Sequence, residues 1–184
     1  MALSKTERLQ LELLIVRLQR GDESAFAPLV AQWERPLLYY LRRIAPTEDD
    51  AWDALQETWL RALRGLPKLR QPGAFPAWIY RIARNAAFAQ QRGQIIHDTL
   101  PEESDRAGPA AEEPDFSPAE AQELHWAIGR LDLLHREPIV LHFLDDLSIA
   151  DIAGLLAIPE GTVKSRIHTA KRKLRHILQE ERAK

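Results

Sequence analysis

Residues 147–174 read LSIADIAGLLAIPEGTVKSRIHTAKRKL, and this stretch decides the fold of the C-terminal part of the chain. Ser148 and Asp151 have the spacing of a helix N-cap, which predicts a short helix over residues 149–156. Ala157-Ile158-Pro159 then predicts a tight turn, and a long basic helix follows it. A short helix, a turn of three or four residues and a basic second helix are typical of a helix-turn-helix motif, which binds duplex DNA.

The final helix has a core face and a polar, basic face. Apolar residues recur at helical spacing, namely Val163, Ile167, Ala170, Leu174 and Ile177. On the remaining surface we expect eight residues to contact phosphates and base edges, namely Thr162, Lys164, Ser165, Arg166, His168, Thr169, Lys171 and Arg172. The alternative is an ordinary surface helix whose cations gather near its C-terminus, where the helix dipole favours them. The capped helix and the turn before it favour DNA binding.

The composition is that of a globular chain, with 45% hydrophobic and 28% charged residues in 184. This length is enough for one ordinary domain or two small ones. The absence of cysteine excludes disulfides and thiolate zinc sites. No apolar run reaches the length that a membrane span needs, so we expect no membrane insertion.

The formal net charge of −2 at first argues against nucleic-acid binding, but it conceals blocks of opposite sign. Residues 58–92 contain seven basic residues and no acidic one, and residues 160–184 have a net charge of +5. Residues 47–57 contain five acidic residues and no basic one, and residues 94–123 have a net charge of −8. Because the Debye length is about 8 Å at physiological salt, each block acts on its own surroundings.

The acidic block in the middle of the chain predicts a flexible linker. Residues 98–115 contain three prolines, a glycine and two pairs of acidic residues, with few apolar residues and no periodicity. Such a segment buries too little surface to offset its ordering entropy. We therefore predict an all-α protein of two small helical domains, 1–93 and 117–184, joined by an acidic linker over 94–116.

Four helices are expected in the first domain. The first ends before Gly21, the second covers about 24–44 with a kink or break at Pro36, and the third extends from Thr47 to Gly65. A loop over 66–73 and a fourth helix over about 74–92 follow.

The third helix carries an acidic face with an apolar edge. Asp53, Gln56, Glu57 and Leu60 lie at i, i+3, i+4 and i+7, so they share one face, which suits a basic partner helix. Paired carboxylates also serve acid–base catalysis or metal binding. No histidine lies there at ligand spacing, so both of these alternatives are weaker.

The fourth helix combines aromatic and cationic residues. Trp78, Arg81 and Asn85 lie along one side, after Arg70 in the basic loop and Phe75. Single-stranded nucleic acid binds such surfaces, since bases stack on aromatic rings and cations follow the backbone. Aromatic residues at helical spacing also form cores, and for Trp78 both interpretations stay open.

Long motifs in both parts resemble those of a known family. DDAWDALQETWLR at 49–61 and AFPAWIYRIARN at 74–85 resemble the second conserved region of sigma-70 factors. LSIADIA at 147–153 and IPEGTVKSR at 158–166 resemble the fourth region. With two regions and a short linker, the chain is similar to the extracytoplasmic-function (ECF) class.

This resemblance implies an alternative sigma factor that directs promoter-specific initiation of transcription and has no catalysis, cofactor or metal of its own. Its expected partners are core RNA polymerase (through the largest and second-largest subunits), promoter DNA and an anti-sigma factor. Asp53, Gln56, Glu57 and Leu60 would dock on core polymerase, and the final helix would read the minus-thirty-five element. The loop over 66–75 would hold a base flipped from the minus-ten element. The residues expected at that element are Arg70, Phe75, Trp78, Arg81 and Asn85. The expected location is cytoplasmic, or at the membrane when an anti-sigma factor holds the protein there.

Three positions depart from the pattern of the family. Ala157 stands where a glycine is common, which costs roughly 1 kcal/mol if the backbone is left-handed. Asp132 follows Leu131 where a Leu-Pro pair is common, and it can cap a helix. Ala89 and the residues after it are less polar than usual, which weakens DNA assignments beyond Asn85.

Two rival functions follow from the residues alone. A one-component helix-turn-helix regulator with a helical sensor half would bind duplex DNA unaided and would not need the acidic face of the third helix. A helical hydrolase would use Asp49, Asp50 or Asp53 with a histidine, but the six histidines are scattered singly along the chain.

Overall fold

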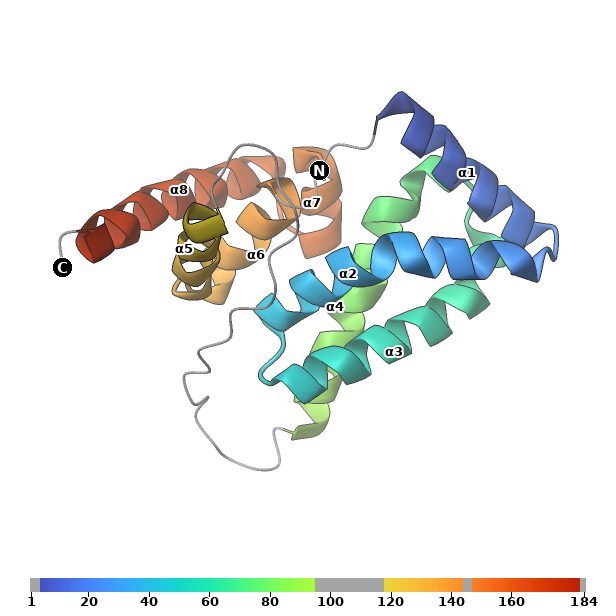
Figure 1. Ribbon diagram of the computed structural model, residues 1–184, viewed down its shortest axis with the longest axis horizontal. Coiled ribbons are helices and arrows are strands. Elements are labelled where there is room, and N and C mark those ends of the chain that lie inside the picture. The colour runs from blue at the N-terminus through green and yellow to red at the C-terminus, as the bar shows by residue number, and fades with distance from the viewer. Residues whose placement is uncertain (1–3, 95–117, 144–146, 183–184) are drawn as a thin grey trace. The chain divides into compact units, whose positions relative to one another are not determined.

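The computed structural model describes residues 4–94, 118–143 and 147–182, and α-helices form most of this part of the chain (Figure 1). No strand occurs within these ranges, so the prediction of an all-α fold is confirmed. None of the helices described is long and apolar enough to cross a membrane. The helices belong to two compact units, one with α1 to α4 and one with α5 to α8. Nearly all of the predicted linker lies outside the described residues.

The first unit contains four helices and three short 3₁₀ turns. Their bounds are α1 Lys5–Gln19, η1 Glu23–Ala25, α2 Phe26–Ile44, α3 Glu48–Gly65, η2 Leu66–Lys68, η3 Pro72–Ala74 and α4 Phe75–Gln94. The helix ends follow local signals in the sequence. The Thr47 hydroxyl accepts a hydrogen bond from the Asp50 amide at 3.1 Å and caps α3. Gly21, with φ of +86°, lies in the turn after α1, where a left-handed backbone favours glycine.

A kink or break was predicted at Pro36, and because α2 is continuous through this residue, the chain does not break there. A proline inside a helix removes one backbone hydrogen bond. The apolar face on both sides of this position offsets that loss, since Trp33, Leu37 and Leu41 are all buried. Tertiary packing therefore outweighs a local helix-breaking signal here.

The core of the first unit lies where α3 packs against α2 and α4. Ala51, Leu55, Thr58 and Ala62 of α3 are buried, and their helical spacing puts them on one side of the helix. The buried Thr58 hydroxyl donates to the Ala54 carbonyl at 2.6 Å, which satisfies its polar group.

Aromatic rings from α2 and α4 complete this core. The Trp33 ring meets the Phe75 ring edge-on with centroids 5.4 Å apart, and Tyr40 meets Tyr80 in the same way at 5.2 Å. Edge-to-face pairs at these distances add to the stabilisation that burial provides.

The second unit packs α5, α6 and α7 against one long helix, α8 (Figure 1). Their bounds are α5 Pro118–Gly129, α6 Leu133–Phe143, α7 Ile149–Leu156 and α8 Glu160–Arg182. The core residues predicted on the last helix are confirmed for Val163, Ile167, Ala170 and Leu174, which are buried. Ile177, farther along the helix, is half-buried.

The turn between α7 and α8 has the predicted geometry. The Ser148 hydroxyl accepts from the Asp151 amide at 3.1 Å and caps α7. Ala157 ends α7 in the left-handed conformation, with φ of 55° and ψ of 46°. The Ile158 amide donates to the Ala153 carbonyl at 3.1 Å, as in a Schellman-type cap. The chain therefore keeps the tight turn and bears the cost of about 1 kcal/mol for alanine at this position.

Candidate functional site

The acidic residues of α3 form one surface, as their spacing predicts. Asp53, Gln56, Glu57 and Leu60 line a single open depression together with Arg61, Ala86 and Ala89. The alanines belong to α4, so small side chains on one helix leave room beside the carboxylates of the other. The Leu60 side chain is 45% exposed and forms the apolar edge. We call the surface formed by these residues the α3 face.

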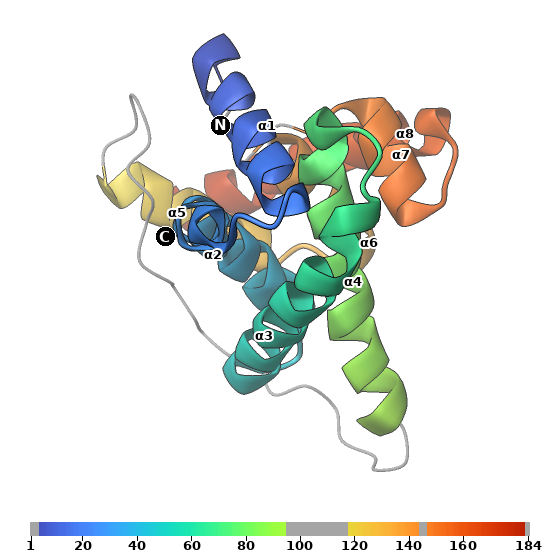
Figure 2. The same ribbon diagram turned by 90° about the vertical axis from the view of Figure 1, so that its right-hand side faces the viewer.

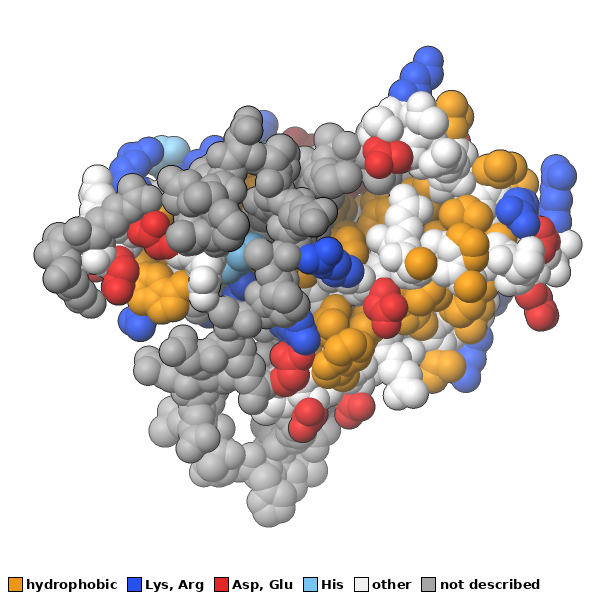
Figure 3. Space-filling model, in the orientation of Figure 1, with side chains coloured by type: hydrophobic (Ala, Val, Ile, Leu, Met, Phe, Trp, Pro, Cys, Tyr) orange, Lys and Arg blue, Asp and Glu red, His pale blue; other side chains and the backbone are white. Residues whose placement is uncertain are grey.

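Further carboxylates extend the negative charge to the start of the helix. The first turn of α3 contains Glu48, Asp49 and Asp50. Figure 3 shows acidic side chains gathered over this end of α3. The Glu48 carboxylate accepts from the Arg42 guanidinium at 2.7 Å, so part of this charge is neutralised within the unit.

Arg61 also lines the α3 face, although the sequence pattern did not single out this residue. The Arg61 Nε donates to Glu57 Oε1 at 2.6 Å, and both side chains are about 40% exposed. An exposed pair of this kind contributes only about 0.3–0.5 kcal/mol, so it breaks at little cost. Asp53, by contrast, is an exposed carboxylate on the same face.

The expected minus-ten residues fall into an exposed group and a buried one. Arg70 in the loop and Arg81 and Asn85 on α4 are exposed, whereas Trp78 is half-buried. The three α4 residues lie at i, i+3 and i+7 and so share one side of the helix. One cation, an amide and an aromatic ring therefore share one side of α4, and Arg70 adds an exposed cation in the loop before it.

Phe75 does not belong to that exposed group. Its side chain has no exposed surface and packs against Trp33 and Trp78. A ring with no exposed surface gives no support to direct contact with DNA, so the role of Phe75 at DNA stays a prediction. The phenyl ring instead anchors the point where the loop enters α4, because burying an aromatic side chain is strongly favourable.

Trp78 is both part of the packing and part of the surface. A side chain at Gly65 would place its Cβ 2.9 Å from Trp78 Cζ2, so the indole lies directly over the last residue of α3. The close approach explains the glycine at this position. It also fixes the ring, whose remaining surface lies on the same side as Arg81 and Asn85.

The expected DNA-binding face of α8 is accessible. Lys164, Ser165, His168, Lys171 and Arg172 are exposed. Thr162, Arg166 and Thr169 are half-buried. The Lys171 ammonium lies 4.4 Å from the centre of the Phe143 ring, a cation–π contact from α6.

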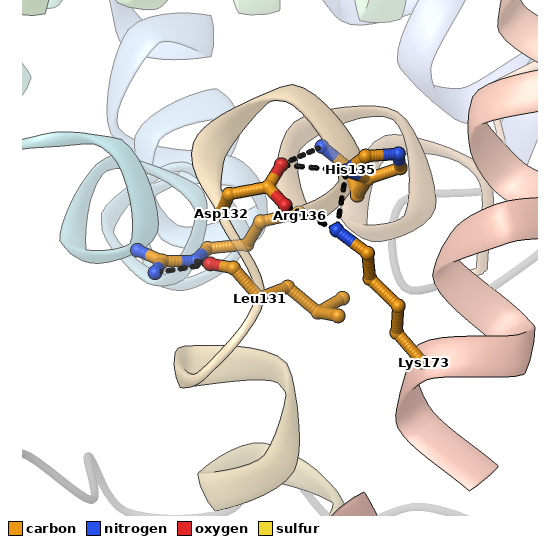
Figure 4. Close-up of polar contacts among 5 residues, drawn as sticks. All are labelled: Leu131, Asp132, His135, Arg136 and Lys173. Atoms are coloured by element: carbon orange, nitrogen blue, oxygen red, sulfur yellow. Dashed lines mark hydrogen bonds and ion pairs between the residues drawn. The ribbon is translucent and has the colours of Figure 1, made fainter. Parts of the chain in front are cut away.

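A polar cluster ties α6 to α8 in the same unit (Figure 4). Asp132 Oδ1 accepts from the His135 amide at 3.2 Å, so the predicted cap by Asp132 is confirmed. Its other oxygen, Oδ2, accepts from Lys173 Nζ at 2.6 Å, and its Oδ1 lies 2.6 Å from His135 Nδ1. Beside it, Arg136 donates to the carbonyls of Gly129 and Leu131 at 2.6 and 2.5 Å, which satisfies backbone groups at the end of α5. Asp132 therefore caps α6 and also links its start to α8.

The charge of Asp132 makes this cluster sensitive to acid. Partial burial by itself would raise the pKa of Asp132, but hydrogen bonds from Lys173 and His135 outweigh it and lower the pKa from 3.8 to about 2. A depressed pKa gives stability that is complete above the unfolded value and is lost as the pH falls through about 2. The side chain is 49% exposed, so screening by solvent reduces the contribution to about 1 kcal/mol.

We therefore expect Asp132→Asn to cost about 1 kcal/mol near pH 6 and progressively less as the pH falls from about 4 to 2. Asparagine also caps helices, so this variant isolates the charge. Urea unfolding of the wild type and the variant across this pH range measures the difference in their free energies of unfolding. The titration of other carboxylates is common to both proteins and cancels in this difference. A difference that stays constant down to pH 2 would contradict the role assigned to the charge.

Comparisons with known proteins agree with this architecture. The family model described as Sigma-70 region 2 matches residues 29–94, and the one described as Sigma-70, region 4 matches residues 121–174. In the first unit these matches cover most of α2 and all of α3 and α4. In the second unit they extend from near the start of α5 into α8. The two matches together define a class of protein, the sigma-70 factors that contain regions 2 and 4.

Relatives that match over most of their length place the chain within that class. It is 32% identical to an ECF RNA polymerase sigma-E factor of Haemophilus influenzae, over 94% of this chain and 97% of the relative. It is 35% identical to the ECF RNA polymerase sigma factor SigM of Mycobacterium tuberculosis, over 94% and 86%. The chain therefore belongs to the ECF class of the sigma-70 family, and it is an alternative sigma factor that directs transcription initiation.

A solved structure has the same fold. The sigma factor RpoE of Bartonella quintana, determined in complex with the anti-sigma factor NepR, matches with a TM-score of 0.71 and 24% identity. The match covers 84% of this chain and 96% of that one.

Membership of the sigma-70 family disfavours both rival functions, the one-component regulator and the hydrolase.

Proposed function

We propose that this sigma factor docks on core RNA polymerase through the α3 face. An acidic surface with an apolar edge suits a basic helix, and the family resemblance points to the clamp helices of the largest subunit. Asp53 and Glu57 supply charge, Gln56 supplies an amide, and the exposed Leu60 supplies apolar contact. The single observation that carries the proposal is that all four side chains line one depression.

The exposed side of the first unit beside α4 is proposed to act at the minus-ten element. Extruding a base from a duplex costs a few kcal/mol, which the protein has to offset by stacking and by charge. Arg70, Arg81 and Asn85 are exposed, and Trp78, whose indole packs over Gly65, lies on the same side of α4 as Arg81 and Asn85. Phe75 contributes by anchoring the loop from within the core.

The accessible face of α8 is proposed to read the minus-thirty-five element. Residues near the N-terminal end of a recognition helix enter the major groove, and cations farther along meet the phosphate backbone. Thr162, Lys164, Ser165, Arg166, His168 and Thr169 lie in the first three turns, with Lys171 and Arg172 after them. Contact of the second unit with the second-largest polymerase subunit is proposed from the family resemblance.

The same resemblance supports an anti-sigma factor as the regulatory partner and the cytoplasm, where polymerase and promoter meet, as the place of action. An anti-sigma factor in the membrane would hold the protein there until release. The protein is proposed to have no catalytic activity of its own, because its task is to assemble polymerase on DNA.

Transcription in vitro tests the proposal as a whole. We expect the purified chain to convert core polymerase, inactive on promoters alone, into a holoenzyme that initiates at defined sites in genomic DNA. Core polymerase with heat-denatured protein is the control. A chain that neither binds core polymerase nor yields defined 5′ ends would overturn the proposal.

A further inference from the structure

The helix α1 lies against the loop that joins α3 to α4 (Figures 1 and 2), and one side chain reaches across to the loop backbone. Gln19 Nε2 donates to the Leu66 carbonyl at 3.1 Å and to the Leu69 carbonyl at 2.7 Å. A side-chain amide nitrogen has two hydrogens, so both are used. The two acceptors follow Gln19 by 47 and 50 residues, so this is a tertiary contact.

The contact determines how the chain approaches Arg70. The Leu66 carbonyl also accepts from the Leu69 amide at 3.1 Å, which closes the turn η2. The Leu69 carbonyl belongs to the peptide that leads directly into Arg70, after which the backbone is extended at Gln71, with φ of −122° and ψ of 105°. Holding that carbonyl therefore fixes the direction in which the exposed middle of the loop leaves η2.

The same helix limits the far end of the loop. The Ala74 amide donates to the Gln71 carbonyl at 3.0 Å to form η3. At Gly73, the position of a Cβ would lie 3.0 Å from the Glu12 Oε1. Two side chains of α1, seven residues apart, thus meet the loop on either side of its extended middle.

The support that α1 provides is itself firmly held. Leu11 and Ile15 are almost completely buried, and a capping box between Ser4 and Glu7 closes the start of the helix. At its end, Arg17 Nε donates to Asp22 at 2.8 Å. A donor that selects a backbone position needs such a fixed scaffold.

We propose that Gln19 is a positioning residue for base selection at the minus-ten element: its amide holds the loop over 66–75 in the shape that accepts the flipped base. This inference rests on the role proposed above for that loop. Selection between bases depends on groups held within a fraction of an ångström. Gln19 itself contacts the backbone of the loop and acts through the Leu69–Arg70 peptide.

The test compares full-length proteins assembled with core polymerase. Gln19→Met keeps the length and packing of the side chain but removes both donors, and Gln19→Glu places an acceptor against the two carbonyls. Gln10→Met is the matched control, since Gln10 is exposed on the same helix. Arg70→Ala tests the loop independently.

Each holoenzyme transcribes a library built on a promoter that the wild-type enzyme uses, with the minus-ten element randomised. Sequencing the transcripts gives the preference for the best base over the worst at each position. We expect Gln19→Met to lower that ratio at least fivefold at one position, and Gln19→Glu to lower it further. Gln10→Met should match the wild type, and core affinity should stay within twofold. The assays are run well below the lowest Tm of the set.

Three results would count against the proposal in distinguishable ways. If both Gln19 variants keep the base preferences of the wild type while Arg70→Ala loses them, the role proposed for Gln19 is wrong and the role of the loop stands. Equal loss of transcription on all library members, with unchanged preferences, would make Gln19 merely structural. Unchanged preferences in every variant, Arg70→Ala included, would overturn the proposed function of the loop itself.

Discussion

Reversing the charges of the α3 face with Asp53→Arg and Glu57→Lys is expected to weaken assembly with core polymerase severely. The two side chains line the same depression, so the double change turns an acidic surface into a basic one. Like charges facing each other across an interface cost several kcal/mol. We expect the Kd for core polymerase to rise about a hundredfold or more, which corresponds to about 2.7 kcal/mol.

The fold should tolerate this double change. Asp53 is exposed, and the loss of the Glu57–Arg61 pair together with repulsion between Lys and Arg costs about 1 kcal/mol or less. Circular dichroism should therefore show a folded protein whose Tm is lower by a few degrees at most. The second unit should keep its affinity for duplex DNA, because its surface is unaltered.

Glu34→Arg with Glu23→Lys supplies a matched control, since both residues are exposed carboxylates of the first unit away from the α3 face. The net charge changes equally in the two double variants. A comparable loss of core binding in the control would mean that overall charge, and not the α3 face, determines docking. Unchanged binding in the α3 variant would remove the docking role altogether.

The part of the fold that could be predicted from the sequence depends on local chemistry. The caps at Thr47 and Ser148 and the left-handed turn at Ala157 each depend on residues a few positions apart. Helical spacing likewise placed Asp53, Gln56, Glu57 and Leu60 on one face, since the period of a helix is known in advance.

The features that the sequence did not disclose depend on contacts between distant segments. Pro36 remains helical because buried side chains surround it, and Phe75 is buried because Trp33 of another helix covers it. Asp132 was expected only to cap α6, yet it also binds Lys173, which is 41 residues away. Glutamine, meanwhile, has no positional preference that would single out Gln19 before its acceptors are placed in space.

Removing two cations from α8, with Arg166→Ala and Lys171→Ala, is expected to weaken promoter binding and to flatten its dependence on salt. Each phosphate contact that is lost lowers the slope of log K against log salt by about 0.9, so the double change should lower it by up to about 2. At physiological ionic strength we expect a loss of affinity of about tenfold or more. Titrating preformed holoenzyme with labelled promoter fragments at several salt concentrations measures both quantities.

Lys173→Ala tests whether a positive charge on α8 that is already paired within the protein contributes to DNA binding. This lysine lies on the same helix and is exposed, but its ammonium already binds Asp132 at 2.6 Å. Using it for a phosphate would break that pair, so its removal should change the salt slope by much less than one contact. The contrary result is a salt slope that falls by about 0.9 for Lys173→Ala but does not fall for Arg166→Ala with Lys171→Ala. That result would place the DNA-binding surface nearer α6. It would also mean that promoter DNA displaces Asp132 from Lys173.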